Sequence, residues 1–191
     1  RLAHTRYRLS FAQNLRTVCV QTQIIEVKYG LGVFVGSIFV SEGALMIYTL
    51  TTNPAIDMNV NSGVPSYTHV NRTTDAVYTP NGKGLNVSFT LAHYGVDSTI
   101  LGFFGGFSGN YIVEEASKVC PVKPVWIDGI TRVNIFVTTP EGELKFPNAG
   151  APVVRSKQNE MLELLRNAPY LNVLVVSGSL SPEMDPTFYD E

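Results

Sequence analysis

From Met46 onward, apolar runs as long as buried strands alternate with segments whose apolar residues recur at helical spacing. The runs rich in β-branched and aromatic residues predict strands at 46–52, 99–104, 122–127 and 171–176. The periodic segments predict helices at 85–94, 110–118 and 156–166, the last capped by Ser156, and a further helix from Pro182. Strands that alternate with helices predict βαβ units, and hence an α/β fold with a mostly parallel sheet covered on both faces.

Two other β-prone regions depart from this alternation. Residues 59–80 form short pieces broken by glycine and proline, and residues 132–146 form a hairpin around Pro140-Glu141-Gly142. These regions leave the main sheet and return to it. We therefore expect a small side sheet next to the main one.

Polar turns follow three of the predicted strands, at residues 53–57, 105–109 and 177–181. Ligands of parallel sheets gather at the carboxyl ends of the strands. These turns are therefore where a binding site is expected.

The composition excludes several classes of protein. The 191 residues are 45% hydrophobic and 16% charged, which excludes a disordered chain. A net charge of −2 gives no basic field for nucleic acid. Two cysteines, Cys19 and Cys120, make neither a disulfide framework nor a four-ligand zinc site, which favours a reducing, cytoplasmic location. No apolar run reaches the roughly 18 residues that span a bilayer, so no membrane partner is expected.

Residues 1–45 differ in composition from residues 46–191. They hold five basic and two acidic residues, whereas the rest of the chain holds nine and fourteen and contains every Met and Pro. One interpretation is a targeting sequence, because Lys28 precedes an apolar stretch, but that stretch lies too far from the N-terminus. The other is upstream sequence translated ahead of Met46, which is the interpretation that we adopt.

The segment Asn81–Asn86 (N-G-K-G-L-N) opens an amphipathic helix. Glycines allow close approach of a ligand, a helix N-terminus offers N–H groups, and Lys83 adds a positive charge, which together suit an anion such as phosphate. The alternative is a hairpin turn at Asn81-Gly82 followed by an ordinary helix start. The spacing alone leaves both open, although it excludes a P-loop, since G-x-x-x-x-G-K-[ST] does not occur.

Other polar residues are candidates for ligand binding, and each also has an ordinary structural interpretation. Asp57 would either accept hydrogen bonds from sugar hydroxyls or cap a turn. Arg132 and Asn134 share a strand face, so they would either meet one ligand or form a solvated pair of side chains. Ser179 and Ser181 suit an anion or a cap for the helix at 182. The three histidines share no ligand spacing, so we expect no metal site in this chain.

Six stretches of the chain stand out together: Met46–Asp57, Val70–Arg72, Asn81–Ser88, Leu101–Tyr111, Thr131–Asn134 and Val176–Leu180. They occur in the order and spacing of the ribokinase-like (PfkB) sugar kinases, and residues 46–191 resemble about the first half of a chain of that family. The resemblance implies a three-layer α/β/α sandwich with a small β-sheet lid, here residues 59–80 and 131–147. Residues 1–45 match nothing in the family.

The resemblance also implies an activity. The full-length enzyme would use ATP and Mg²⁺ to phosphorylate a sugar phosphate, most simply fructose 1-phosphate to fructose 1,6-bisphosphate, with tagatose 6-phosphate as the alternative. A homodimer through the lid sheet is a further expectation. The non-enzymatic alternative is a sugar-phosphate-binding fragment.

The resemblance assigns substrate-binding roles to eight residues. Asp57 would hold sugar hydroxyls, and Asn134 would lie beside the substrate phosphate. The others are Gly82, Lys83 and Asn86 at the sugar, and Arg72, Arg132 and Ser179 at the phosphate.

The chain departs from the family pattern in three places. Asn81 stands where Gly or Ala is common, and Ser181 stands where Pro is usual. The family's G-A-G-D segment, which holds the catalytic base, has no counterpart, because no G-x-G-D occurs in the 191 residues. We therefore expect no catalytic residue and no kinase activity in these 191 residues.

Overall fold

The computed structural model describes residues 38–39 and 46–191. The interpretation of residues 1–45 as a leader therefore lies outside the described residues, apart from Ile38–Phe39, which form strand β1.

The main sheet has the strand order β1-β9-β2-β5-β6. Four of its strands run parallel, and β1 pairs antiparallel with β9 at the edge. The strands are β1 (Ile38–Phe39), β2 (Met46–Thr51), β5 (Ser98–Phe104), β6 (Val122–Trp126) and β9 (Leu171–Val176). All four strands predicted from the apolar runs are present, so the mostly parallel sheet is confirmed.

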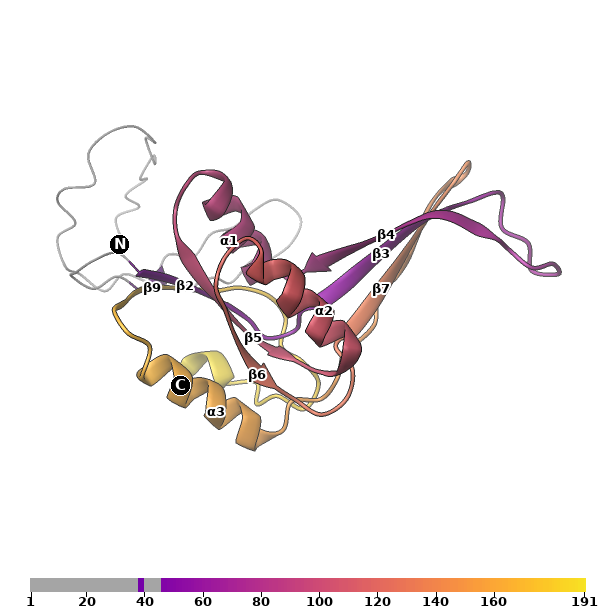
Figure 1. Ribbon diagram of the computed structural model, residues 1–191. Coiled ribbons are helices and arrows are strands. Elements are labelled where there is room, and N and C mark those ends of the chain that lie inside the picture. Colours follow the sequence, from indigo (N-terminus) through magenta and orange to yellow (C-terminus); the bar gives the residue numbers. More distant parts are fainter. Residues whose placement is uncertain (1–37, 40–45) are drawn as a thin grey trace, which may run out of the picture.

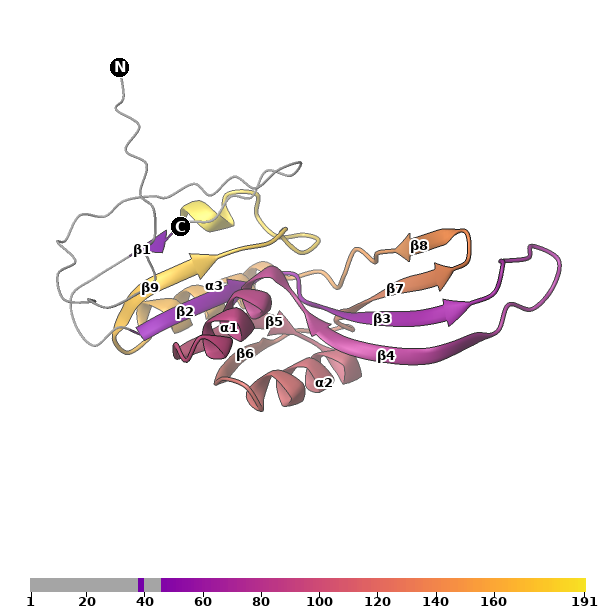
Figure 2. The ribbon, with the colours of Figure 1, turned by 90° about the horizontal axis from the view of Figure 1, so that it is seen from above.

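Helices cover both faces of this sheet (Figures 1 and 2). Helices α1 (Lys83–His93) and α2 (Gly106–Ser117) lie on one face, and α3 (Arg155–Arg166) lies on the other. No helix in the described part of the chain is long and apolar enough to cross a membrane. The layers are those of the expected α/β sandwich.

The side chains of β5 alternate between two core clusters, one on each face of the main sheet. Ile100 and Phe104 pack toward α1 and α2, whereas Leu101 and Phe103 pack in the cluster that includes Met161 of α3. All five side chains are at most 1% exposed. Successive residues of a strand point to opposite faces, so a continuous apolar run is what a strand buried on both faces requires.

A second sheet, with the order β4-β3-β7-β8, projects from this body (Figures 1 and 2). Its strands are β3 (Ala55–Ser62), β4 (Thr73–Asn81), β7 (Arg132–Thr139) and β8 (Gly142–Phe146). The two β-prone regions thus form the small side sheet that the sequence predicts. Its root, where β3 begins and β4 ends, lies next to the end of β2.

Two of the predicted polar turns are shorter than expected. Strand β3 already begins at Ala55, because residues 55–57 pair with both β4 and β7, so Asp57 is a strand residue and not part of a turn. Helix α2 begins at Gly106 rather than 110. Gly105, which precedes this helix, packs closely, since a Cβ there would lie 2.8 Å from backbone oxygens of Ile127 and Gly129.

Two helix predictions are also wrong in detail. Helix α3 begins at Arg155 after Val154, so Ser156 lies inside its first turn and does not cap it. No α-helix forms from Pro182, and the described C-terminal residues contain turns and the short 3₁₀-helix η1 (Phe188–Asp190). Glu183 has a φ of 61°, and Pro186 lacks an N–H, so both interrupt a helix there.

Candidate functional site

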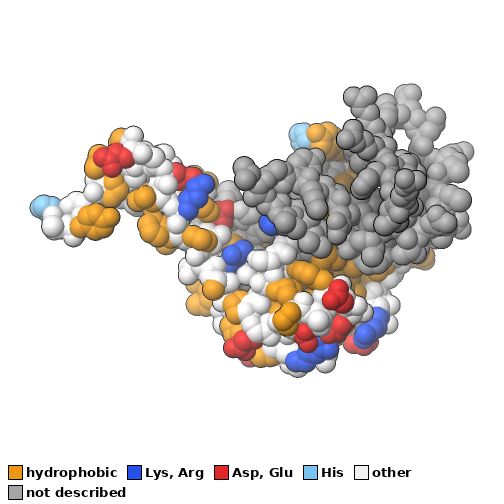
Figure 3. Space-filling model, turned by 180° about the vertical axis from the view of Figure 1, so that it is seen from behind, with side chains coloured by type: hydrophobic (Ala, Val, Ile, Leu, Met, Phe, Trp, Pro, Cys, Tyr) orange, Lys and Arg blue, Asp and Glu red, His pale blue; other side chains and the backbone are white. Residues whose placement is uncertain are grey.

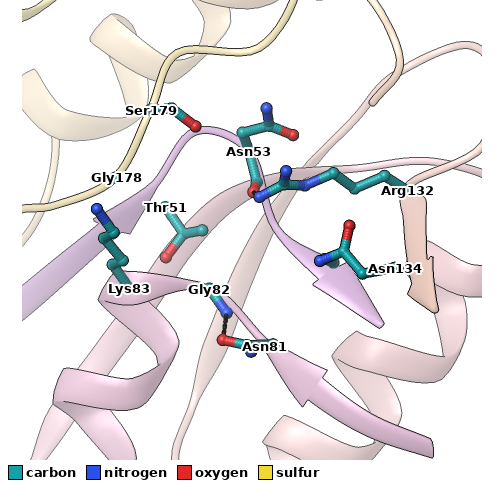
Figure 4. A pocket seen from close by; sticks show the side chains of 10 residues that line it. Thr51, Asn53, Asn81, Gly82, Lys83, Arg132, Asn134, Gly178 and Ser179 are labelled. Carbon is teal, nitrogen blue, oxygen red and sulfur yellow. Dashed lines mark hydrogen bonds between the residues drawn. The ribbon is translucent and has the colours of Figure 1, made fainter. Parts of the chain in front are cut away.

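A cavity of about 160 Å³ lies where β2 ends, α1 begins and the second sheet is rooted (Figure 4). The segment that follows β9 closes its remaining side. The lining residues are Thr51, Asn53, Ala55, Asn81, Gly82, Lys83, Arg132, Asn134, Gly178 and Ser179. The cavity is therefore polar and is built from parts of the chain that are distant in sequence.

The N-terminus of α1 forms one wall of the cavity. Gly82 precedes the helix with a φ of 153°, a conformation that favours glycine. Gly84 lets the helix approach β2, because a Cβ there would lie 2.8 Å from the Leu50 carbonyl oxygen. Thr51 Oγ1 accepts a hydrogen bond from Leu85 N at 3.1 Å, which caps the first turn. Asn81-Gly82 therefore joins β4 directly to a helix and is not a hairpin turn.

Lys83 and Ser179 approach the cavity from opposite walls. Lys83 extends from the first turn of α1 toward the Gly178–Ser179 segment (Figure 4). The Ser179 carbonyl oxygen accepts a hydrogen bond from Thr52 Oγ1 at 2.9 Å, which fixes that segment against the end of β2. Ser181 does not line the cavity, because it is buried and its Oγ donates to Thr52 O at 2.7 Å.

Arg132, the first residue of β7, is held by backbone carbonyl groups. Its Nη2 donates to Asn53 O at 3.0 Å, its Nη1 to Asn148 O at 3.1 Å, and its Nε to Pro54 O at 3.4 Å. Burial lowers the pKa of the guanidinium, and the charge of Asp57 partly opposes that shift. A guanidinium has five N–H groups, so two donors remain for a ligand in the cavity.

Asp57 lies between two amides at the root of the second sheet. Its Oδ1 accepts a hydrogen bond from Asn134 Nδ2 at 2.8 Å, and its Oδ2 accepts one from Asn81 Nδ2. Asn134 Oδ1 in turn accepts from Asn148 N at 3.1 Å. The row of side chains crosses β4, β3 and β7 and places acceptor groups beside the cavity.

The structure brings seven of the eight predicted site residues together. Five line the cavity, namely Gly82, Lys83, Arg132, Asn134 and Ser179. Asp57 and Asn86 are not lining residues, but each is hydrogen-bonded to the side chain of Asn81, which lines the cavity.

Arg72 lies elsewhere. It precedes Thr73, which pairs with Ser62, whereas the cavity lies where Asn81 pairs with Ala55. At about 3.3 Å per residue, the length of β4 separates Arg72 from the cavity by roughly 25 Å. Its assignment to the substrate phosphate therefore has no support from its position within this chain.

Sequence reasoning did not assign the other lining residues. Thr51 lies in a predicted strand and carries no chemical signal in the sequence, whereas Ala55 and Gly178 lie in the predicted polar turns at 53–57 and 177–181. The polar turn after the first strand did indicate Asn53, whose Nδ2 donates to Ala149 O at 3.0 Å and to Leu180 O at 3.3 Å. Asn81 was visible as a departure from the family pattern.

The hydroxyl of Tyr189 supports the wall formed by the segment after β9. It lies 2.5 Å from Thr52 Oγ1, and it donates to Gly178 O at 3.4 Å. Burial raises the pKa of Tyr189, and the hydrogen bond with Thr52 opposes the shift. Tyr189 of the 3₁₀-helix thereby links the end of β2 to the residues that follow β9.

The arrangement suits a ligand that carries both an anionic group and hydroxyl groups. Lys83 and the N-terminus of α1 line one side of the cavity (Figure 4). Arg132 lies across from them on β7, beside Asn134 and the Asp57 carboxylate to which Asn134 donates. Within residues 38–39 and 46–191, no three His, Cys, Asp or Glu side chains group as metal ligands.

Comparison with known proteins gave curated and structural relatives, although no family model matches the chain. The chain is 42% identical over 147 residues to D-tagatose-1-phosphate kinase of Klebsiella oxytoca, which covers 76% of this chain and 48% of that protein. It is 35% identical to 1-phosphofructokinase of Haloferax volcanii, covering 73% and 46%. The phosphofructokinase-2 of Escherichia coli in complex with fructose-6-phosphate superposes with a TM-score of 0.68 and 28% identity, covering 76% and 49%. The chain spans about half the length of the curated relatives that it matches.

Proposed function

We propose that this chain, which belongs to the ribokinase-like (PfkB) family of carbohydrate kinases, forms the sugar-phosphate-binding part of an ATP-dependent sugar-phosphate kinase. The observation that carries the proposal is the cavity in which Arg132 faces Lys83 and the N-terminus of α1, next to the Asp57 carboxylate. A phosphate ester of a sugar has the charge and the hydroxyl groups that these parts recognise.

The groups that surround the cavity have different tasks. The guanidinium of Arg132 is held in place before a ligand arrives, so its two remaining donors meet the ligand's phosphate at little entropic cost. Lys83 and the helix N-terminus add positive potential from across the cavity. Asp57 accepts hydrogen bonds from hydroxyls, since carboxylate oxygens are acceptors.

The substrate that we propose is a ketohexose phosphate, with D-fructose 1-phosphate converted to fructose 1,6-bisphosphate. D-tagatose 1-phosphate is a second candidate, because two relatives of that name are 42% and 41% identical to this chain. Relatives named tagatose-6-phosphate kinase are 33% and 34% identical, which makes tagatose 6-phosphate a third. The polar residues of the cavity suit all three, since each ligand combines a phosphate with hydroxyl groups.

Phosphoryl transfer needs a base at the attacking hydroxyl and electrostatic stabilisation of the transferred group, which Mg²⁺ helps to supply when bound. We assign neither ATP nor Mg²⁺ to any described residue. The described residues bind the acceptor sugar phosphate and orient it. Positioning of this kind supplies a large part of catalysis in phosphoryl transfer.

Isothermal titration calorimetry on the 191-residue chain tests the proposal. We expect D-fructose 1-phosphate or D-tagatose 1-phosphate to bind more tightly than D-fructose and inorganic phosphate do separately. Binding of the phosphate alone, with no gain from the sugar, would favour a general anion site. No binding of any sugar phosphate would contradict the proposal.

We also propose that a second copy of the chain packs on the projecting sheet. Cross-strand partners share a face, and one face carries apolar side chains at neighbouring positions. They are Met58, Tyr78, Ile135, Val137, Leu144 and Phe146. Tyr78, Leu144 and Phe146 are 50%, 41% and 53% exposed, and Figure 3 shows apolar side chains along this projection.

A homodimer would bury the same apolar face of both copies, as a two-fold interface requires. Phosphofructokinase-2 of Escherichia coli, a relative of known structure, has a tetrameric form. Light scattering after size exclusion should give twice the chain mass, and Phe146→Asp should give the single mass. A monomeric unaltered chain would contradict this interface.

A further inference from the structure

Asn81, the last residue of β4, forms hydrogen bonds with three different parts of the cavity wall. Its Nδ2 donates to Asp57 Oδ2, and its Oδ1 accepts from Gly82 N at 2.6 Å and from Asn86 Nδ2 at 2.9 Å. The bond to Gly82 is drawn in Figure 4, where Asn81 lies below the open space of the cavity. One side chain thus connects the carboxylate, the residue that precedes α1 and the first turn of that helix.

The carboxylate of Asp57 is held on both of its oxygens. Asn134 from β7 donates to Oδ1 and Asn81 from β4 donates to Oδ2, and β3 lies between these two strands. An ionised carboxylate has about four acceptor positions. Each oxygen therefore keeps acceptor capacity, and the two amides fix the plane in which it is offered.

The contacts of Asn81 also connect two groups that suit different parts of a ligand. Asp57 suits hydroxyl groups, whereas Gly82 precedes the helix whose N-terminus suits an anion. The distance between the Asp57 carboxylate and this helix N-terminus decides which phosphate esters reach both of them. Among the described residues, Asn81 is a side chain that hydrogen-bonds to both.

We propose that Asn81 is a positioning residue that fixes the Asp57 carboxylate relative to the N-terminus of α1. It thereby selects phosphate esters that carry hydroxyl groups over phosphate itself. The proposal rests on the proposed function, because it deepens the account of the same cavity. Asn81 acts through Asp57 and Gly82, and its own contact with a ligand is not required.

The test compares two ligands on four forms of the 191-residue chain. D-fructose 1-phosphate and inorganic phosphate are titrated into the unaltered chain, Asn81→Ala, Asn81→Asp and Asn61→Ala. Asn61→Ala is a matched control, because Asn61 Nδ2 donates to Asp75 Oδ2 at 3.1 Å across the same pair of strands, at the end away from the cavity. Asn81→Asp keeps the size of the side chain and removes the donor to Asp57. The readout is the ratio of the two affinities, which cancels a general effect of added negative charge on anion binding.

We expect Asn81→Ala to lower the affinity for D-fructose 1-phosphate about tenfold, the loss typical of one hydrogen bond to a charged group. The affinity for inorganic phosphate should fall much less, so the ratio should fall. Asn81→Asp should lower the ratio at least as much, and Asn61→Ala should leave it unchanged.

Other outcomes overturn the proposal in distinguishable ways. A ratio that Asn81→Asp leaves unchanged would show that Asn81 only fills space, and would overturn the proposal even if Asn81→Ala does not fold. An equal drop in Asn61→Ala would show a general effect on the strand pair. If the unaltered chain binds no sugar phosphate, the proposed function fails and the role of Asn81 fails with it.

Discussion

Replacing Arg132 by alanine removes the most firmly held cation of the cavity. Its guanidinium bonds to three backbone carbonyls, of Asn53, Pro54 and Asn148, and the side chain is half-buried. The two donors that remain are the ones that we assign to the ligand's phosphate. The substitution therefore acts on ligand binding and on the loops that the guanidinium joins.

The expected size of each effect follows from the bonds that are lost. A hydrogen bond between charged groups contributes on the order of 1.5–3 kcal/mol, so the affinity for D-fructose 1-phosphate should fall roughly ten- to a hundredfold. The free energy of unfolding should fall by about 1–3 kcal/mol, because Asn53 and Pro54 are buried and their carbonyl groups lose a donor. Arg132→Lys should recover part of the affinity, since it keeps the charge but cannot bridge several carbonyls.

Calorimetry and urea unfolding on the same preparations measure both effects. Arg155→Ala is the matched control, because Arg155 lies on α3 and pairs with Glu191 through two hydrogen bonds of 2.7 and 2.8 Å. It should leave the affinity unchanged. In a full-length enzyme, Arg132→Ala should raise KM for the sugar phosphate and barely change KM for ATP. An affinity unchanged by Arg132→Ala, or an equal loss in Arg155→Ala, would refute the assignment.

Three other substitutions or assays test separate parts of the account. Gly84→Ala should lower the free energy of unfolding by about 1–2 kcal/mol, because its Cβ would lie 2.8 Å from Leu50 O. Gly63→Ala is the control and should change it by less than about 0.5 kcal/mol, since a Cβ there has nothing within 4 Å. Equal effects in urea unfolding would refute the close packing at Gly84. Deleting residues 1–45 should leave the affinity for sugar phosphate within about twofold, since every lining residue lies at Thr51 or beyond; a larger loss by calorimetry would give these residues a role. A coupled ADP-release assay on the 191-residue chain with D-fructose 1-phosphate should show no sugar-dependent turnover, because no G-x-G-D occurs in it, and turnover above the no-enzyme rate would require a base among these residues.

The main elements could be predicted because their patterns are local. The strand at 99–104 is an apolar run, and the helix that opens at residues 81–86 combines glycines with apolar spacing. Both patterns depend on neighbours along the chain. The element ends were harder to predict, because tertiary contacts decide them, as the pairing of residues 55–57 with two strands shows.

The candidate site could be predicted only in part, for a physical reason. Lys83 and Arg132 are charged residues at the starts of elements, so the sequence marks them. Asn53 donates to the carbonyl groups of Ala149 and Leu180. These residues are distant in sequence, and no local pattern reveals that they lie beside Asn53. Conversely, a family motif alone assigned Arg72 to the site, and the length of β4 separates it from the cavity.

The most direct test of sugar-phosphate binding is an amide chemical-shift titration of the 191-residue chain with D-fructose 1-phosphate. The account predicts saturable shifts at the amides that surround the cavity: Gly82–Leu85, Arg132–Asn134 and Gly178–Ser179. Amides of the strand ends far from the cavity, such as Ser62 and Thr73, should stay in place. Saturable shifts confined to another surface, or none at millimolar ligand, would contradict the account.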